Sequence, residues 1–146
     1  MSANVAERVV VVAMRLLAAG FAVVGILFVA TPDGVIEALD DVGRSIGGFD
    51  PGPRTDQRLW LALGFAYMTV IAGLALVVSF DVARFRPMLL VLAAGKAASS
   101  LAAGAYFLFD DDVFAYLLNF LVDGALVAVA LWCWALAGRV EPRAPG

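Results

Sequence analysis

The amino-acid sequence predicts an all-α integral membrane protein, an up-down-up-down four-helix bundle with a short amphipathic helix in its long first outer loop. The first observation is composition: 63% of the 146 residues are hydrophobic, 16% are charged, and the mean hydropathy is +0.93. A typical soluble domain is roughly 45–50% apolar and about 25% charged. The second observation is four long apolar stretches, each sufficient to cross a hydrocarbon core about 30 Å thick. We therefore expect a single membrane domain over residues 1–146.

The four expected membrane spans cover residues 9–30, 59–80, 87–109 and 113–137. The last three are joined by the short connections 81–86 and 110–112, and short connections place successive helices antiparallel. The first span is longer than the apolar core of a signal peptide, about 7–15 residues, and Arg15 interrupts it. We therefore expect the first span to persist as a helix.

The loop at residues 31–58 has a helical pattern of its own. Thr31-Pro32 is typical of a helix start and Gly47-Gly48 of a helix end. Between them the apolar residues recur at helical spacing: Val35, Leu39, Val42 and Ile46. The other side is polar: Glu37, Asp40, Asp41 and Arg44. This pattern predicts an amphipathic helix that either closes the bundle mouth as a lid or lies at the lipid head groups; we favour the second.

The placement of the arginines predicts the orientation. With a cytoplasmic N-terminus, the inner segments carry Arg8, Arg15, Arg84, Arg86, Arg139 and Arg143, and the outer segments carry Arg44, Arg54 and Arg58. The positive-inside rule favours this arrangement. Trp60, Trp132 and Trp134 fall near the expected interfaces, where tryptophan is enriched. We expect a multi-pass protein of the plasma (inner) membrane with both termini in the cytoplasm.

Several kinds of site are excluded or disfavoured by composition. Cys133 is the only cysteine, so the chain forms no internal disulfide, and the absence of histidine removes the usual haem and zinc ligand and the commonest general base. No clustered ligand pattern indicates a metal site, and no basic face indicates nucleic-acid binding. We therefore predict no cofactor, no metal and no catalytic residue, and the sequence favours a protein that is not an enzyme.

Two ionisable residues fall deep inside the expected spans. Lys96 lies about 14 Å from the inner start of span 87–109, and Asp123 about 15 Å from the outer start of span 113–137, at 1.5 Å per helical residue. Both positions are near the midplane of a core about 30 Å thick. A charge there is costly unless it is paired or hydrated. Because the two spans are neighbours, we predict an intramembrane ion pair between Lys96 and Asp123.

Further polar residues share the faces of this pair. Ser99 and Ser100 follow Lys96 by three and four residues, and Asn119 precedes Asp123 by four, so we predict a polar centre made of these five residues. Arg15, Tyr67 and Thr69 are possible contributors, although Arg15 can instead extend to the inner interface. The polar centre either binds a polar group or relays a proton, or it only fixes helix packing or joins a partner subunit.

Span 87–109 has small residues at four-residue spacing. One set is Ala94, Ala98 and Ala102, and the other is Gly95, Ser99 and Ala103. Small residues let helices approach closely in membranes. This span is therefore expected to be either the central helix or the surface for a second copy or a partner membrane subunit.

These patterns leave three classes of function open. The first is an accessory or assembly subunit, or a membrane protein that binds a small ligand at the Lys96–Asp123 centre. The alternative is a small proton-coupled transporter that works as a homodimer. The third class is a membrane enzyme or a binder of a lipid or quinone head group, with Asp123 and Lys96 as acid and base. It is the weakest class, because the chain has no histidine, no second clustered acid and no cofactor motif.

The layout of the chain resembles the DoxX-like small bacterial four-helix membrane proteins and neighbouring uncharacterised families. The resemblance rests on "ATPDG" at the end of the first span, "RLWLALGFAYMTVIAGLAL" in the second and "GKAASSLAAG" in the third. It covers most of the chain as a pattern and implies the four-helix membrane fold. The excess of arginine over lysine also agrees with a bacterial source.

Overall fold

The computed structural model describes residues 2–54 and 58–140 and contains five helices in that part of the chain. The helices are α1 (Ala3–Ala30), α2 (Pro32–Ile46), α3 (Arg58–Phe80), α4 (Arg86–Phe109) and α5 (Phe114–Ala137). All of them except α2 are long and apolar enough to cross a membrane. The all-α prediction is therefore confirmed. Arg143, used above for the orientation, lies outside the described residues.

The helix α1 begins at Ala3, earlier than the expected start at residue 9. The reason is packing: Ala6 and Val10 are fully buried in the same core as Cys133. The first turns of α1 are therefore stabilised by packing against this core, although hydropathy alone places them outside the span.

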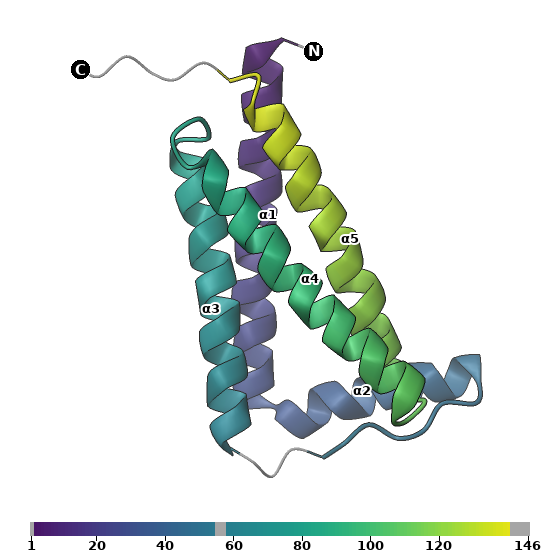
Figure 1. Ribbon diagram of the computed structural model, residues 1–146. Coiled ribbons are helices and arrows are strands. Elements are labelled where there is room, and N and C mark those ends of the chain that lie inside the picture. Colours follow the sequence, from purple (N-terminus) through teal and green to yellow (C-terminus); the bar gives the residue numbers. More distant parts are fainter. Residues whose placement is uncertain (1, 55–57, 141–146) are drawn as a thin grey trace.

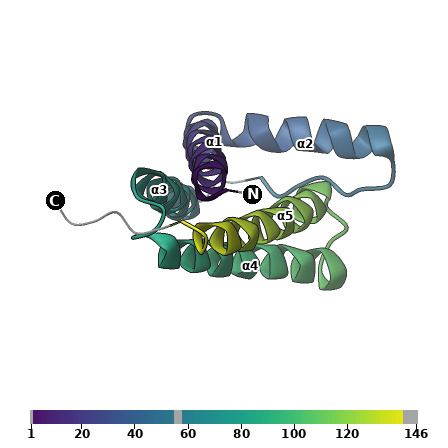
Figure 2. The same cartoon turned by 90° about the horizontal axis from the view of Figure 1, so that it is seen from above.

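The four long helices form two pairs. Successive long helices run in opposite directions, with α1 against α3 and α4 against α5 (Figure 1). The pairs converge where both described ends of the chain lie, which we call the terminal end. They diverge toward the α2 end, where α2 crosses from the last residue of α1 toward the start of α5 (Figures 1 and 2). The outline is a wedge rather than a cylinder.

The third span was expected to be either the central helix or a surface for a partner, and α4 is the most buried of the four long helices. Figure 2 shows α4 at the edge of the molecule, where it packs mainly against α5 and less against α3. Two helices each contact three others: α1 contacts α2, α3 and α5, and α5 contacts α1, α2 and α4. Small residues bring α4 closest to α5, where a Cβ on Gly104 would lie 2.8 Å from the Phe120 ring, while a Cβ on Gly95 would lie 3.6 Å from the Tyr67 hydroxyl of α3.

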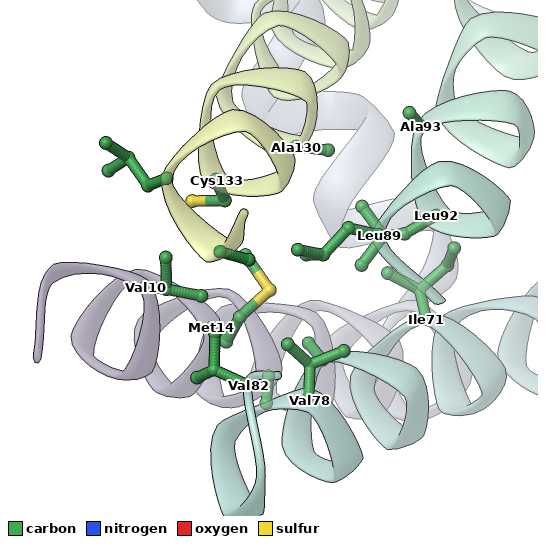
Figure 3. Close-up of a cluster of buried hydrophobic side chains, with 14 of the residues drawn as sticks. Val10, Met14, Ile71, Val78, Val82, Leu89, Leu92, Ala93, Ala130 and Cys133 are labelled. Atoms are coloured by element: carbon green, nitrogen blue, oxygen red, sulfur yellow. The ribbon is translucent and has the colours of Figure 1, made fainter. Parts of the chain in front are cut away.

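The hydrophobic core lies at the terminal end of the wedge. Val10 and Met14 of α1, Val78 of α3, Leu89 of α4 and Cys133 of α5 are all fully buried (Figure 3). Residues from all four long helices therefore meet at one level. Beyond this level the pairs separate, and the interior becomes polar and then hollow.

The helix α2 is docked on the start of α5 by polar and aromatic contacts. The backbone N–H of Gly52 donates to Asp40 Oδ1 at 2.8 Å, and the N–H of Asp50 donates to the carbonyl of Asp112 at 3.0 Å. The ring of Phe49 packs edge-on against Phe114 at 5.3 Å. Asp40, which the sequence pattern places on the polar side of this helix, is buried, because its carboxylate holds the returning chain after α2.

Candidate intramembrane binding site

An ion pair lies at the centre of the molecule. The Lys96 ammonium on α4 is 2.9 Å from Asp123 Oδ1 on α5, and both side chains are almost fully buried. The pairing predicted from depth is therefore present. Each charge balances the other, which lowers the cost of burying them in an apolar bundle.

Aromatic rings from the other helix pair cover the ammonium group. Lys96 Nζ lies 4.0 Å from the ring centroid of Phe21 on α1 and 5.2 Å from that of Tyr67 on α3. A desolvated cation over a ring face gains about 2 kcal/mol. The Tyr67 hydroxyl also donates to the carbonyl of Gly95 at 3.0 Å, which connects α3 to α4. The ammonium thus has favourable contacts with three other helices.

The Asp123 carboxylate is less well satisfied. Its Oδ1 accepts from Lys96, but Oδ2 is buried and has no hydrogen-bond donor among the described residues. A buried charged oxygen without a donor costs at least about 1–3 kcal/mol. The site therefore contains one acceptor that gains stability from any donor brought to it.

The neighbouring polar residues join α4 to α5 in two separate bonds. Asn119 Nδ2 donates to Ser99 Oγ at 3.3 Å, and Ser100 Oγ donates to the carbonyl of Phe120 at 2.8 Å. Ser99 and Asn119 line a cavity beside the ion pair, whereas the buried Ser100 packs between α4 and α5. Within the predicted polar centre, Ser100 thus has a helix-joining position and the other four residues face the cavity.

The structure places two of the predicted contributors away from the polar centre. Thr69 Oγ1 donates to the carbonyl of Phe65 one turn earlier in its own helix, and Thr69 is exposed. Arg15 is exposed and lines a separate hollow with Arg8 and Ser79, close to the last residues of α3. Only Tyr67 of these three reaches Lys96.

A cavity of about 480 Å³ adjoins the ion pair, and we call it the lysine cavity. It lies between the two helix pairs, and Lys96, Asp123, Ser99, Asn119 and Tyr67 are its polar lining. The remaining lining is apolar or glycine. Its volume falls within the range of about 300–1,000 Å³ that is usual for small-molecule sites.

A second cavity, of about 610 Å³, extends from the first toward α2, and we call it the α2 cavity. The two cavities share the lining residues Val24, Phe28, Ser99, Asn119 and Val122. Val35, Ile36 and Leu39 of α2 form part of its wall. The apolar face of α2 is thus divided, because Val42 and Ile46 are exposed instead.

Both cavities communicate with the surroundings of the molecule. Val24 of α1 and Val122 of α5 line both cavities and remain 39% and 47% exposed. The two cavities are therefore open at the side of the bundle, between α1 and α5.

Sequence reasoning missed three features of this site. Phe21 carries no signal, since one more aromatic residue in an apolar span is not distinguishable from a lipid-facing one. The open space beside Gly20 and Gly64 was also not predicted; both line the lysine cavity, and a Cβ added to either would meet nothing within 4 Å. Nor did it predict Asp40 as the anchor of α2, because the helical pattern places Asp40 on the polar side of its helix, one turn from Arg44.

Comparison of the chain with protein-family models, with curated proteins and with solved structures found no match. The resemblance to DoxX-like proteins therefore stays a prediction that rests on the sequence pattern alone.

Proposed function

We propose that this protein binds a small hydrophobic ligand from the lipid phase, in the lysine cavity between its two helix pairs. In this proposal the four long helices cross a bacterial plasma membrane in an up-down-up-down bundle, with both termini in the cytoplasm and α2 at the outer surface. The observation that carries the proposal is a buried ion pair, Lys96–Asp123, that borders a largely apolar cavity and leaves Asp123 Oδ2 without a donor.

A purely structural ion pair accounts less well for this arrangement. A pair that only joins α4 to α5 needs no adjoining cavity, and its charges are best satisfied when every donor and acceptor is used. Here the hollow begins at the pair and continues along apolar walls to α2. This combination of an apolar chamber with few polar groups is typical of ligand sites.

The test uses two glycines of α3 that both have open space around them. Gly64 lines the lysine cavity, whereas Gly73 is exposed on the outside of the bundle. Wild type, Gly64→Leu and Gly73→Leu are purified from native membranes in mild detergent and analysed by native mass spectrometry. We expect a retained small molecule on wild type and on Gly73→Leu and its loss from Gly64→Leu. Equal retention by all three, or none on wild type, contradicts the proposal.

A second candidate function is assembly with another membrane subunit or a second copy. The observation that favours it is the set Ala94, Ala98 and Ala102, which lies exposed on one face of α4. Small exposed residues in an apolar helix allow another helix to approach closely. Ala98→Phe is then expected to release a partner during mild purification, with Ala128→Phe on the exposed side of α5 as the control. Unchanged mass for both variants contradicts this candidate.

A proton-coupled transporter remains the alternative use of the same site. It requires the ligand to cross the bilayer in response to a pH gradient. The test measures flux of the ligand into proteoliposomes for wild type and for Asp123→Asn. Loss of flux in a variant that still folds would indicate transport rather than binding alone.

A further inference from the structure

We infer that the lysine cavity selects a neutral, single-chain lipid alcohol, with its hydroxyl group at Asp123 and its chain in the α2 cavity. This inference rests on the proposed function, because it names the chemical class of the ligand for the same site.

The first step concerns hydrogen bonding. The pair offers an acceptor, since Asp123 Oδ2 has no donor among the described residues. The Lys96 ammonium already donates to Asp123 Oδ1 and lies over the rings of Phe21 and Tyr67, while Ser99 and Asn119 supply further donors in the cavity lining. A ligand therefore gains most if it brings a donor, and a molecule that can only accept leaves Oδ2 unsatisfied.

The second step concerns charge. The formal charges of Lys96 and Asp123 cancel, and no other charged residue lines either cavity. An ammonium head group adds an unbalanced cation to this apolar chamber, and a carboxylate head group adds an anion beside the existing one. Either addition costs more than a neutral hydroxyl group, which supplies a donor without a net charge.

The third step concerns shape. The lysine cavity continues into the α2 cavity, whose walls are mostly aliphatic and aromatic. Tyr116, beside that cavity, is seven residues or about 10 Å along α5 from Asp123. The joined cavities thus offer an apolar path of at least about 10 Å, along which an extended chain can reach Val35, Ile36 and Leu39 of α2. The apolar side chains of both cavities can make favourable dispersion contacts with such a chain.

The carboxylate must turn slightly to accept the ligand. Oδ2 is buried in the structure, while the Asp123 side chain lines the lysine cavity. Rotation about the last bond of an aspartate is soft, because its rotamer distribution is broad. One oxygen can thus stay on Lys96 while the other faces the hydroxyl group.

The experiment uses a matched set of photoreactive probes. These are 1-dodecanol with a diazirine at the end of its chain, the methyl ether of this alcohol, and the corresponding dodecanoic acid and dodecylamine. Wild-type protein in phosphatidylcholine nanodiscs is labelled with each probe, and the modified peptides are located by mass spectrometry. We expect the alcohol to label the segment from Val35 to Leu39, with the ether, acid and amine each labelling about tenfold less.

Two variants connect the preference to the site. Gly64→Leu is expected to reduce labelling by all four probes, and Gly73→Leu to change none. In the double variant Lys96→Met/Asp123→Leu, which removes both charges together, the alcohol and its ether should label equally. The comparison between alcohol and ether on wild type stands even if this double variant does not fold.

The outcomes separate this inference from the proposed function. If the ether, acid or amine labels wild type as strongly as the alcohol, and Gly64→Leu reduces that labelling, the ligand class is wrong while the binding site stands. If Gly64→Leu does not reduce the labelling by any probe, the proposed binding function is wrong, and the inferred ligand class is wrong with it.

Discussion

At the scale of single residues, Lys96 and Asp123 depend on each other. Removal of one side chain leaves the other as an uncompensated buried charge, which costs about 3–5 kcal/mol. Lys96→Met and Asp123→Leu alone should therefore each lower the free energy of unfolding by about this amount, and the double variant should recover much of it. Reversible unfolding in mixed detergent micelles measures the free energy of unfolding of wild type, the two single variants and the double variant.

The exposed pair Arg54–Glu37 is the control for this cycle. Its atoms are 3.0 Å apart, but both side chains are half exposed or more, so we expect a coupling of at most about 1 kcal/mol. Additive effects of Lys96→Met and Asp123→Leu, with no recovery in the double variant, would mean that the buried pair does not couple.

Two glycines should respond in opposite ways to a single added methyl group. A Cβ at Gly104 would approach the Phe120 ring to 2.8 Å, so Gly104→Ala forces α4 away from α5 and should cost about 1–3 kcal/mol. Gly73→Ala meets nothing within 4 Å and should cause no loss, since alanine is the better helix former. Thermal unfolding of both variants decides the point; equal melting temperatures would contradict the close approach.

The ion pair was predictable at this scale, and its aromatic cover was not. Depth along two adjoining spans and the cost of an unpaired charge together identify Asp123 as the partner of Lys96. No such argument selects Phe21, because its position over the ammonium depends on the rotation of α1 about its axis. Asp40 was assigned to the polar side of its helix, since the pattern does not reveal that Gly52 returns to it.

At the scale of elements, α2 depends on its contact with the chain that follows it. Asp40→Ala removes the acceptor of the Gly52 N–H, and a hydrogen bond to a charged group contributes about 1.5–3 kcal/mol. We expect faster hydrogen exchange of the Gly52 amide and of α2, with α4 and α5 unchanged. Asp41→Ala is the control, because Asp41 pairs with Arg44 at the exposed surface. Unchanged exchange in Asp40→Ala would show that the aromatic contact of Phe49 alone holds α2.

Helix existence and approximate ends followed from hydropathy and turn residues. Three spans differ from the helices by a residue, with α3 beginning at Arg58, α4 at Arg86 and α5 at Phe114. The start of α1 was missed, because its first turns gain their stability from contacts with α5 that no local pattern contains.

At the scale of the whole molecule, the two helix pairs share a hydrophobic core at one end, whereas α2 bridges α1 and α5 at the other. Spin labels at Val77 of α3 and Leu90 of α4 are near the core, and labels at Leu63 and Leu108 are near the α2 end; all four residues are exposed. We expect a broader distance distribution for the second pair of labels in double electron–electron resonance, because the buried core that joins the pairs lies at the opposite end. Equally narrow distributions would indicate a rigid wedge.

This divergence could not be derived from the sequence. In a membrane the side chains that face lipid are as apolar as those that face the core, so hydropathy identifies a span without identifying its buried face. Val24 is therefore indistinguishable by type from Val10, although the first lines a cavity and the second is fully buried. The arrangement of the pairs is decided by shape, which only the three-dimensional packing contains.

The wedge outline also has a consequence for the surrounding bilayer. With the four long helices across the bilayer, as proposed, the wedge (Figure 1) is wider in one leaflet than in the other and displaces unequal areas of lipid, as a cone-shaped inclusion does. Lipids around such an inclusion pack best where the bilayer bends to match it. The protein should therefore concentrate in regions of membrane whose curvature matches its taper. This enrichment should increase with the separation of the two helix pairs at the α2 end.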